Sequence, residues 1–298
     1  MPATNRRTGP ADSSCAPSTD FALYRANANY YRDAMTYETI ILEHGVGDDE
    51  GIATITLNRP AKKNAANEQM WEELLDVFRA LGEGLGARCV VVTGAGGAFC
   101  SGADLSGRDQ RERPHQLISM RRISDVALAL HRLPMPTIAK VGGVAAGAGC
   151  NLALGCDLIV ASDTARFSEI FAKRGLAIDF GGSWLLPRLI GLHKAKELAF
   201  LAEVISASEA ERIGIVNRVV AADELDAFVS DWARRLASGP PLALRMTKRL
   251  LNEGGATSMD QALEAEGWTQ TVTIASSADA VEAMGAFIEK REPKFRGR

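Results

Sequence analysis

Residues 136–168 read PTIAKVGGVAAGAGCNLALGCDLIVASDTARFS, and this stretch decides the fold. Residues 137–141 form a short apolar run typical of a buried strand, and residues 157–162 and 165–168 have the same character. Between these runs, small residues lead into an apolar segment that predicts a helix around Asn151. Strands and helices in alternation predict an α/β fold, in which helices pack outside a mixed or parallel sheet.

The same alternation continues toward the N-terminus. Residues 37–44 and 52–57 are predicted strands joined by a turn, and residues 89–94 are a buried strand. Asn67 can cap the helix that lies between them. One face of that helix carries Met70, Leu74, Val77 and Leu81. Residues 115–133 form a further helix, and from residue 183 onward the sequence predicts helices almost throughout.

The first 20 or so residues are rich in Pro, Ser, Thr and Asp, which favours disorder. Residues 21–35 can form a short helix, and Met35 stands directly before the first predicted strand. One hypothesis is that the natural chain starts at Met35. Residues 1–36 are therefore set apart as an N-terminal extension that is disordered or helical.

Composition excludes several function classes. The 298 residues carry a net charge of −3, so there is no electrostatic reason to expect nucleic acid or a membrane surface as a partner. No apolar run approaches the ~20 residues of a membrane span. The five cysteines form no CxxC pair and indicate reduced thiols of a cytoplasmic protein. Four histidines lack any metal-binding spacing, so no metal is expected, and His131 is expected to be solvated at a helix end.

Two loops rich in small residues can offer backbone N–H groups. The nucleotide pattern GxGxxG fails in both, because Phe99 and Leu152 stand where its last glycine belongs. One loop contains Gly102, Ala103 and Asp104. The other opens a helix at Ala148, and the first N–H groups of a helix are unpaired. Two such groups that converge make an oxyanion hole. Either loop taken alone is better explained as a tight turn.

Several motifs in a fixed order give the sequence a family resemblance. They are ITLNRPAKKNAAN (55–67), VVVTGAGGAFCSGADL (90–105), the stretch at 136–168, GGSWLLPRLIG (181–191) and AFIEKREPKF (286–295). Together they resemble the enoyl-CoA hydratase/isomerase (crotonase) family across residues 37–298. The resemblance implies a crotonase-like spiral of ββα units in residues 37–225. It also implies a C-terminal helical oligomerisation region, residues 226–298, that forms a homotrimer or a dimer of trimers.

The family implies an acyl-CoA thioester as substrate, with coenzyme A as part of that substrate and no separate cofactor. Its thioester oxygen is held by two backbone N–H groups, which match Ala103 and Ala148 here. Donors aimed at this oxygen stabilise an enolate, and losing one costs ~3–4 kcal/mol. Segments that match the coenzyme A contacts contain Lys63, Asp104, Leu105 and Ser106. Lys63 is equally well explained as a solvated lysine.

The two glutamates of the family's hydratases are absent. Asn151 and Phe171 occupy their positions, and neither side chain can take up a proton near neutral pH. An acid remains at Asp179, where related isomerases carry one that faces the acyl chain. The acyl pocket is predicted to contain Asn151, Phe171, Phe180 and Trp184. Apolar neighbours raise the pKa of a carboxyl group by desolvation, which suits a base.

Alternatives remain for each acid. Asp179 can instead cap the helix that follows it. Glu169 is a second candidate acid, for which a position at the rim is favoured. A dehalogenase-like site is disfavoured, because Ser124 stands where that branch carries a histidine. Three functions follow: an isomerase that uses Asp179, a hydratase that uses Asp179 with Glu169, and a non-catalytic acyl-CoA-binding member. The isomerase is favoured.

Overall fold

The computed structural model describes residues 36–84, 86–106 and 115–297. Within these residues, the chain from Thr36 onward forms one compact unit. The extension predicted for residues 1–36 lies outside the described residues except for Thr36, and so does the hypothesis about Met35.

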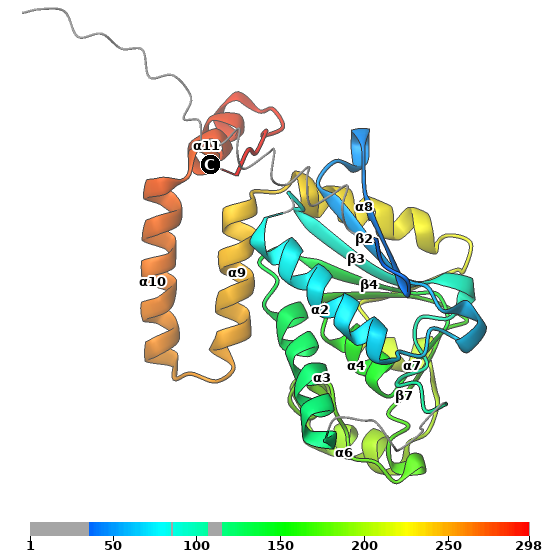
Figure 1. Ribbon diagram of the computed structural model, residues 1–298. Helices are drawn as coiled ribbons and strands as arrows, with labels where there is room; N and C mark the ends of the chain where they lie inside the picture. The colour runs from blue at the N-terminus through cyan, green and yellow to red at the C-terminus, as the bar shows by residue number, and fades with distance from the viewer. Residues whose placement is uncertain (1–35, 85, 107–114, 298) are drawn as a thin grey trace, which may run out of the picture. The chain divides into compact units, whose positions relative to one another are not determined.

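Six strands form the larger sheet (Figure 1). They are β1 (Ile40–His44), β2 (Ile52–Leu57), β3 (Cys89–Gly94), β4 (Thr137–Val141), β6 (Leu158–Ser162) and β9 (Arg218–Val220). Their order is β1-β2-β3-β4-β6-β9; β1 pairs antiparallel with β2, and all the other pairs are parallel. The central strands are covered on both faces, which explains why they read as continuous apolar runs.

A second, three-stranded sheet turns the chain into a spiral. It contains β5 (Val144–Ala146), β7 (Arg166–Ser168) and β8 (Ile205–Ser206). After β4 the chain makes β5 and then helix α4 (Ala148–Leu154); after β6 it makes β7 and then helix α5 (Gly182–Ile190). Each turn thus gives one strand to each sheet and ends in a helix. The predicted spiral of ββα units is confirmed.

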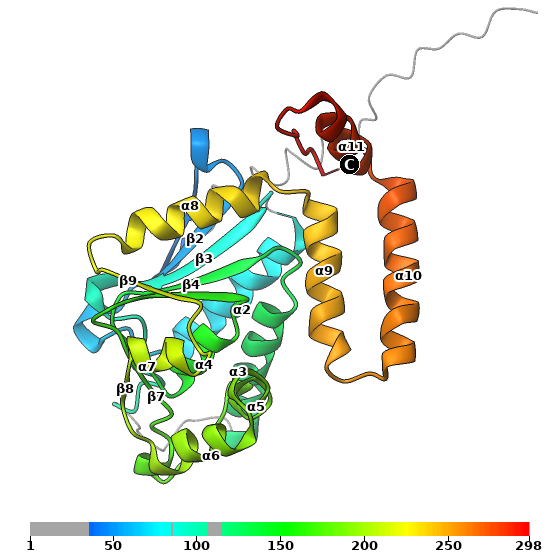
Figure 2. The same ribbon diagram turned by 180° about the vertical axis from the view of Figure 1, so that it is seen from behind.

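Helices cover both faces of the larger sheet (Figures 1 and 2). On one face lies α2 (Glu68–Glu83), which packs beside α3 (Gln116–His131). The predicted cap of α2 is confirmed, because the N–H of Met70 donates to the side chain of Asn67 at 3.0 Å. The opposite face is covered by α8 (Leu225–Ser238), whose apolar residues join Val91, Ile138 and Val160 of the strands.

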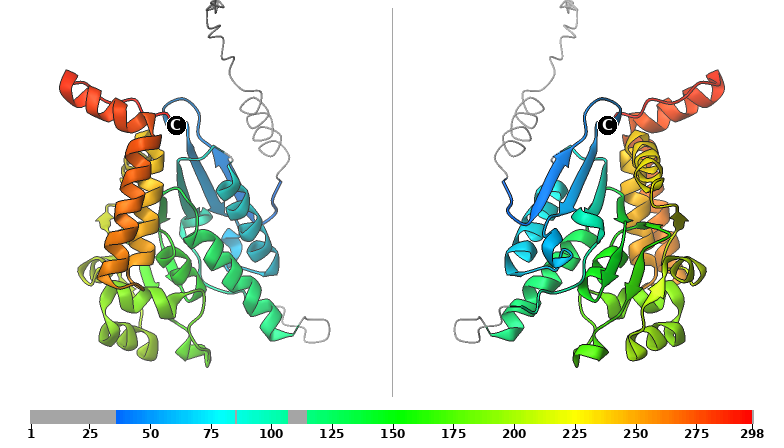
Figure 3. Two further views of the ribbon diagram at one scale, coloured as in Figure 1. Left: turned by 90° about the vertical axis from the view of Figure 1, so that its left-hand side faces the viewer. Right: turned by 90° about the vertical axis from the view of Figure 1, so that its right-hand side faces the viewer.

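The other helices come after α5 in the chain. They are α6 (Leu192–Leu201), α7 (Ala207–Arg212), α9 (Pro241–Gly254), α10 (Met259–Ser276) and α11 (Ala278–Glu289). Short 3₁₀ turns occupy Gly47–Asp49, Pro60–Lys62, Ala95–Gly97 and Ala172–Arg174. Figures 1 and 2 show α9 and α10 side by side, and in the views of Figure 3 one of the two helices lies in front of the other. Lys248 fixes α9 to the core through Asp157, 2.7 Å away, and the carbonyl of Met135, 3.0 Å away.

Three strands escaped the sequence analysis. β5, β8 and β9 have three, two and three residues, too few for a period of two to emerge. β8 and β9 interrupt the segment predicted to be almost wholly helical.

The boundary predicted at residue 225 stays a prediction, but α8, which follows it, packs on the sheet. No helix among the described residues is long and apolar enough to cross a membrane.

Candidate active site

Two backbone segments meet beside the start of α4, and the first carries Ala103. The N–H of Ala66 donates to the carbonyl of Gly102 at 2.8 Å, and the N–H of Asp104 donates to the carbonyl of Ala66 at 2.8 Å. Both bonds lie on one side of the extended chain. The N–H of Ala103, between them, therefore points to the other side, away from Ala66.

The second segment carries Ala148. A Cβ on Gly102 would lie 2.8 Å from the carbonyl oxygen of Ala146 and 3.7 Å from the nitrogen of Ala148, so only glycine permits this approach. Ala148 is the first residue of α4, and its N–H has no partner within the helix. In the described ranges, no backbone acceptor is bonded to the N–H of Ala103 or Ala148. The structure thus brings together the two predicted oxyanion donors; their role stays a prediction.

The residues predicted to contact coenzyme A lie along the same loop. The carboxylate of Asp104 is 2.9 Å from the guanidinium of Arg59 and accepts from the N–H and hydroxyl of Ser106 at 2.9 and 2.6 Å. The Ser106 hydroxyl, followed by Arg59, lowers the pKa of Asp104 to about 2. Asp104 therefore shapes the loop, while the side chains of Leu105 and Lys63 remain exposed. The exposure of Lys63 is consistent both with a contact to coenzyme A and with a solvated lysine.

Asn151 joins three elements at the centre of the site. Its side chain is 0% exposed, and its Nδ2 donates to the carbonyl of Asp179 at 2.9 Å and to Oε2 of Glu169 at 3.4 Å. A Cβ on Gly182 would lie 2.4 Å from that Nδ2, so α5 begins directly against the amide. The amide thus takes the place of a titrating group and connects the two remaining acids.

Asp179 does not cap α5, so that alternative is wrong. The N-cap is Gly181, with no side-chain hydrogen bond, and the N–H of Gly182 donates to the main-chain carbonyl of Asp179 at 3.0 Å. Oδ1 of Asp179 is buried and has no hydrogen-bond partner in the described part of the chain. Burial raises the pKa of Asp179 to about 6. A carboxylate with an unused oxygen and this pKa can exchange protons near neutral pH.

Glu169 is buried at 2% exposure, so the expected position at the rim is wrong. Burial, with a smaller effect of the charge of Asp179, raises its pKa to about 7, although hydrogen bonding with Cys150 and Asn151 acts in the opposite direction. Its Oε1 also lacks a hydrogen-bond partner among the described residues. One signal of this burial is present in the sequence: Glu169 lies between two phenylalanines, Phe167 and Phe171. Both of them are buried in the structure.

The predicted acyl pocket is partly assembled. Phe171 is buried, and its Cζ lies 3.7 Å from where a Cβ of Gly147 would be, beside the start of α4. Phe180 packs on Trp71 with ring centroids 5.4 Å apart. Its φ of +51° is unusual for a bulky residue and marks strain next to Asp179. Trp184 lies farther along α5, against His131 at 5.4 Å.

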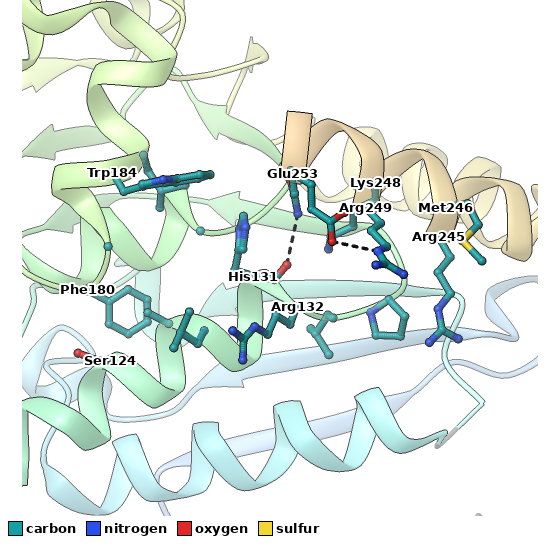
Figure 4. Close-up of a pocket in the computed structure, with 18 of the residues that line it drawn as sticks. Ser124, His131, Arg132, Phe180, Trp184, Arg245, Met246, Lys248, Arg249 and Glu253 are labelled. Atoms are coloured by element: carbon teal, nitrogen blue, oxygen red, sulfur yellow. Dashed lines mark hydrogen bonds and ion pairs between the residues drawn. The ribbon is translucent and has the colours of Figure 1, made fainter. Parts of the chain in front are cut away.

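A cavity of about 950 Å³ extends from Phe180 and Gly181 between α3, α5 and α9 (Figure 4). His131 and Ser124 of α3 line it together with Trp184. His131 ends α3, as expected, but it is half-buried and not fully solvated, and burial lowers its pKa. The lining of this cavity by α9 could not be predicted, because no local sequence pattern shows which distant helix closes a cavity. Residues of the described ranges form no group of three or more metal-ligating side chains.

Comparison with known proteins agrees with this geometry. A family model described as enoyl-CoA hydratase/isomerase matches residues 47–298. The chain is 37% identical to a 1,2-epoxyphenylacetyl-CoA isomerase of Escherichia coli, over 84% of this chain and 97% of the relative. It is 36% identical to a crotonyl-CoA hydratase of Syntrophomonas wolfei, over 88% and 99%. An enoyl-CoA hydratase structure from Bacillus anthracis matches with a TM-score of 0.83 and 31% identity, over 88% of this chain and 100% of that one.

The buried carboxyl group of Glu169 predicts a pH-dependent effect on stability. Its pKa in the folded state lies above its ordinary value of 4.5, so the folded state binds the proton more tightly than the unfolded state. The contribution of this group is therefore fully present below pH 4.5 and is lost as the pH rises through about 7. Glu169→Gln cannot ionise. We expect it to stabilise the protein at pH 8 by about 1–3 kcal/mol relative to its effect at pH 5.

Thermal unfolding of both proteins at the two pH values measures this difference. Glu203→Gln, at an exposed glutamate on the chain after α6, is the matched control and should have the same small effect at both. Equal effects of Glu169→Gln at both pH values would mean that Glu169 ionises without penalty in the folded protein.

Proposed function

Because this chain belongs to the enoyl-CoA hydratase/isomerase family, we propose that it shifts a double bond in an acyl-CoA thioester, from the 3-enoyl to the 2-enoyl position. The observation that carries this proposal is the carboxylate of Asp179: buried, with an unused oxygen, and with a pKa raised to about 6. A double-bond shift needs only one group that removes a proton and returns it. The chain is an enzyme of the hydratase/isomerase kind; which of the two reactions it performs is our proposal.

The proposed reaction proceeds through a thioester enolate. Asp179 removes a proton from the α-carbon, and the electrons of the C–H bond move onto the thioester oxygen. The N–H groups of Ala103 and Ala148 stabilise the negative charge there. The enolate then collapses as the γ-carbon takes the proton back from Asp179, which leaves the double bond conjugated with the thioester. At pH 7, most Asp179 is ionised and ready to act as the base.

Hydration is the second candidate, and Glu169 favours it. Its pKa of about 7 and its closeness to Asp179 would suit a pair in which one acid activates water and the other delivers a proton. A relative is named crotonyl-CoA hydratase. Against hydration, Nδ2 of Asn151 lies within hydrogen-bonding distance of Glu169, and Glu169 is almost inaccessible. An acyl-CoA-binding protein without catalysis is the third candidate.

The acyl group is not restricted to a straight chain. Phe180 directly follows Asp179, and the ring of Phe171 lies beside the start of α4. The E. coli relative is named for a ring-bearing substrate. That relative is named an isomerase, whereas others of similar identity are named hydratases, so the choice between the two reactions rests on Asp179. A ring-bearing or medium-length 3-enoyl group is therefore proposed.

Association into a homotrimer or a dimer of trimers is also proposed, and the surface of α10 and α11 supports it. Large apolar side chains are exposed there, among them Trp268 at 68% and Phe287 at 81%. Neighbouring exposed residues are Met259, Leu263, Val272, Ile274, Val281, Met284 and Ile288. Apolar exposure on this scale marks an interaction surface in a water-soluble protein.

The Asp179 mechanism predicts a large loss of isomerisation in Asp179→Asn. An amide cannot accept the proton, so kcat for a 3-enoyl-CoA should fall by about 10²-fold or more. Wild-type kcat/KM should rise with pH and level off above about pH 6, because the ionised carboxylate is the base. Both follow from absorbance of the conjugated thioester in steady-state assays. Leu176→Ala, which removes an exposed side chain and no acid from the segment before Asp179, is the control for loop damage.

Three outcomes would contradict the proposal in different ways. Isomerisation that survives in Asp179→Asn would exclude Asp179 as the base. Rapid hydration of a 2-enoyl-CoA that is lost in Glu169→Gln would favour the acid pair. Binding of the thioester without any turnover would favour the third candidate.

The oligomer proposal predicts that Phe287→Glu reduces the molecular mass in solution. A charge in the buried centre of an interface is unfavourable, so the variant should dissociate to a smaller species by light scattering. Phe200→Glu alters an equally bulky residue on α6, 71% exposed, and should leave the mass unchanged. A monomeric wild type would exclude the proposed assembly.

A further inference from the structure

We propose that the cavity between α3, α5 and α9 takes the distal end of the acyl group, and that this end carries an anionic group such as a carboxylate. The proposal rests on the proposed function for the thioester substrate, but not on which reaction the site performs. It concerns the chemical class of acyl chain that the enzyme prefers.

The cavity lies where a chain would arrive after passing the acid. Phe180 and Gly181, the two residues directly after Asp179, line its near end. Gly155 also lines it and follows α4, the helix that begins at Ala148. For a thioester held at Ala148, with its reacting carbons at Asp179, we place the distal end of the acyl chain past Phe180, in this cavity. A volume of about 950 Å³ exceeds what a short acyl group fills.

The walls nearest the acid are apolar. They comprise Ala127, Leu128, Phe180, Trp184 and Leu185. Met246 of α9 lies farther along, beside Arg245 (Figure 4). These side chains favour methylene groups, at about 0.8 kcal/mol for each one removed from water. The first part of an acyl chain beyond the reacting carbons thus meets a surface that suits it.

The wall formed by the end of α3 and by α9 is cationic (Figure 4). Lys248 is balanced by Asp157 at 2.7 Å, and Arg249 by Glu253 at 2.9 Å. Arg132 and Arg245 also line the cavity, and neither has a carboxylate within 4.0 Å among the residues that the structure describes. Two guanidinium groups without a counter-charge thus border a cavity whose walls near Phe180 are apolar.

A carboxylate is the ligand chemistry that fits these groups. A guanidinium binds a carboxylate through two parallel hydrogen bonds, which makes arginine well suited to recognise it. His131 adds no positive charge, because burial and the nearby Lys248 lower its pKa. Its neutral ring forms part of the cavity wall beside Trp184. An acyl chain with an apolar middle and an anionic end therefore complements the cavity along its whole length.

The same arginines could instead meet the phosphates of coenzyme A. A matched pair of ligands separates the two sources of negative charge, because both thioesters carry the same coenzyme A. The first is a saturated medium-chain acyl-CoA that ends in a methyl group. The second has the same length and ends in a carboxylate. Neither can be turned over by a double-bond shift, so titration calorimetry reports binding alone.

We expect wild-type protein to bind the carboxylate-ended thioester more tightly. Arg132→Gln and Arg245→Gln should each weaken that ligand by roughly tenfold and leave the methyl-ended one unchanged. Since both arginines are exposed, the preference should shrink as salt is added. Arg121→Gln is the matched control: it removes an exposed arginine of α3 that does not line the cavity, and it should change neither affinity.

Other outcomes overturn the proposal. Equal weakening of both thioesters would assign the arginines to the phosphates of coenzyme A. No response to either substitution, or a preference for the methyl-ended ligand, would mean that the cavity takes no anionic end. Asp179→Asn should abolish isomerisation while the binding preference persists. Failure of the proposed function is therefore seen in turnover, and failure of the cavity proposal in binding.

Discussion

The amide of Asn151 is the contact on which the geometry of the site depends. It lies in the core, where a polar group without a partner is costly, and its Nδ2 therefore fixes what surrounds it. The bond to the carbonyl of Asp179 holds the segment that precedes α5 against α4. Close contact with Gly182 leaves no room for a side chain at the start of α5. Because α4 also begins at Ala148, one helix positions both the proposed oxyanion donor and the proposed base.

Two consequences follow for the acids. Asp179 and Glu169 are both desolvated, and ionising one makes it harder to ionise the other. Their pKa values of about 6 and 7 place the first ionisation on Asp179, which is also the more accessible group. Glu169 then remains partly protonated near neutral pH. A cluster with one negative charge, held by a neutral amide, fits a reaction that moves one proton out and back.

Much of the fold could be predicted from sequence, because its main signals are local. The cap at Asn67, the apolar face of α2 and the buried run of β3 each depend on neighbours along the chain. β5, β8 and β9 could not be found this way, since strands of two or three residues exist only through their pairing partners. The oxyanion loops and Asp179 came from motifs. Glu169 and His131 were misjudged because burial is a property of the assembled structure.

The asparagine at position 151, where the family's hydratases carry a glutamate, affects the pKa of Asp179. A glutamate at this position would be a third carboxyl group within hydrogen-bonding distance of Glu169 and beside the Asp179 segment. Three buried carboxyl groups could not all ionise, so the pKa of Asp179 would rise above about 6 and less of it would be a base at pH 7. The amide keeps the hydrogen-bonding role of that position and removes its charge. Removal of this charge thus leaves Asp179 better ionised beside Glu169, which the proposed single-base mechanism would require.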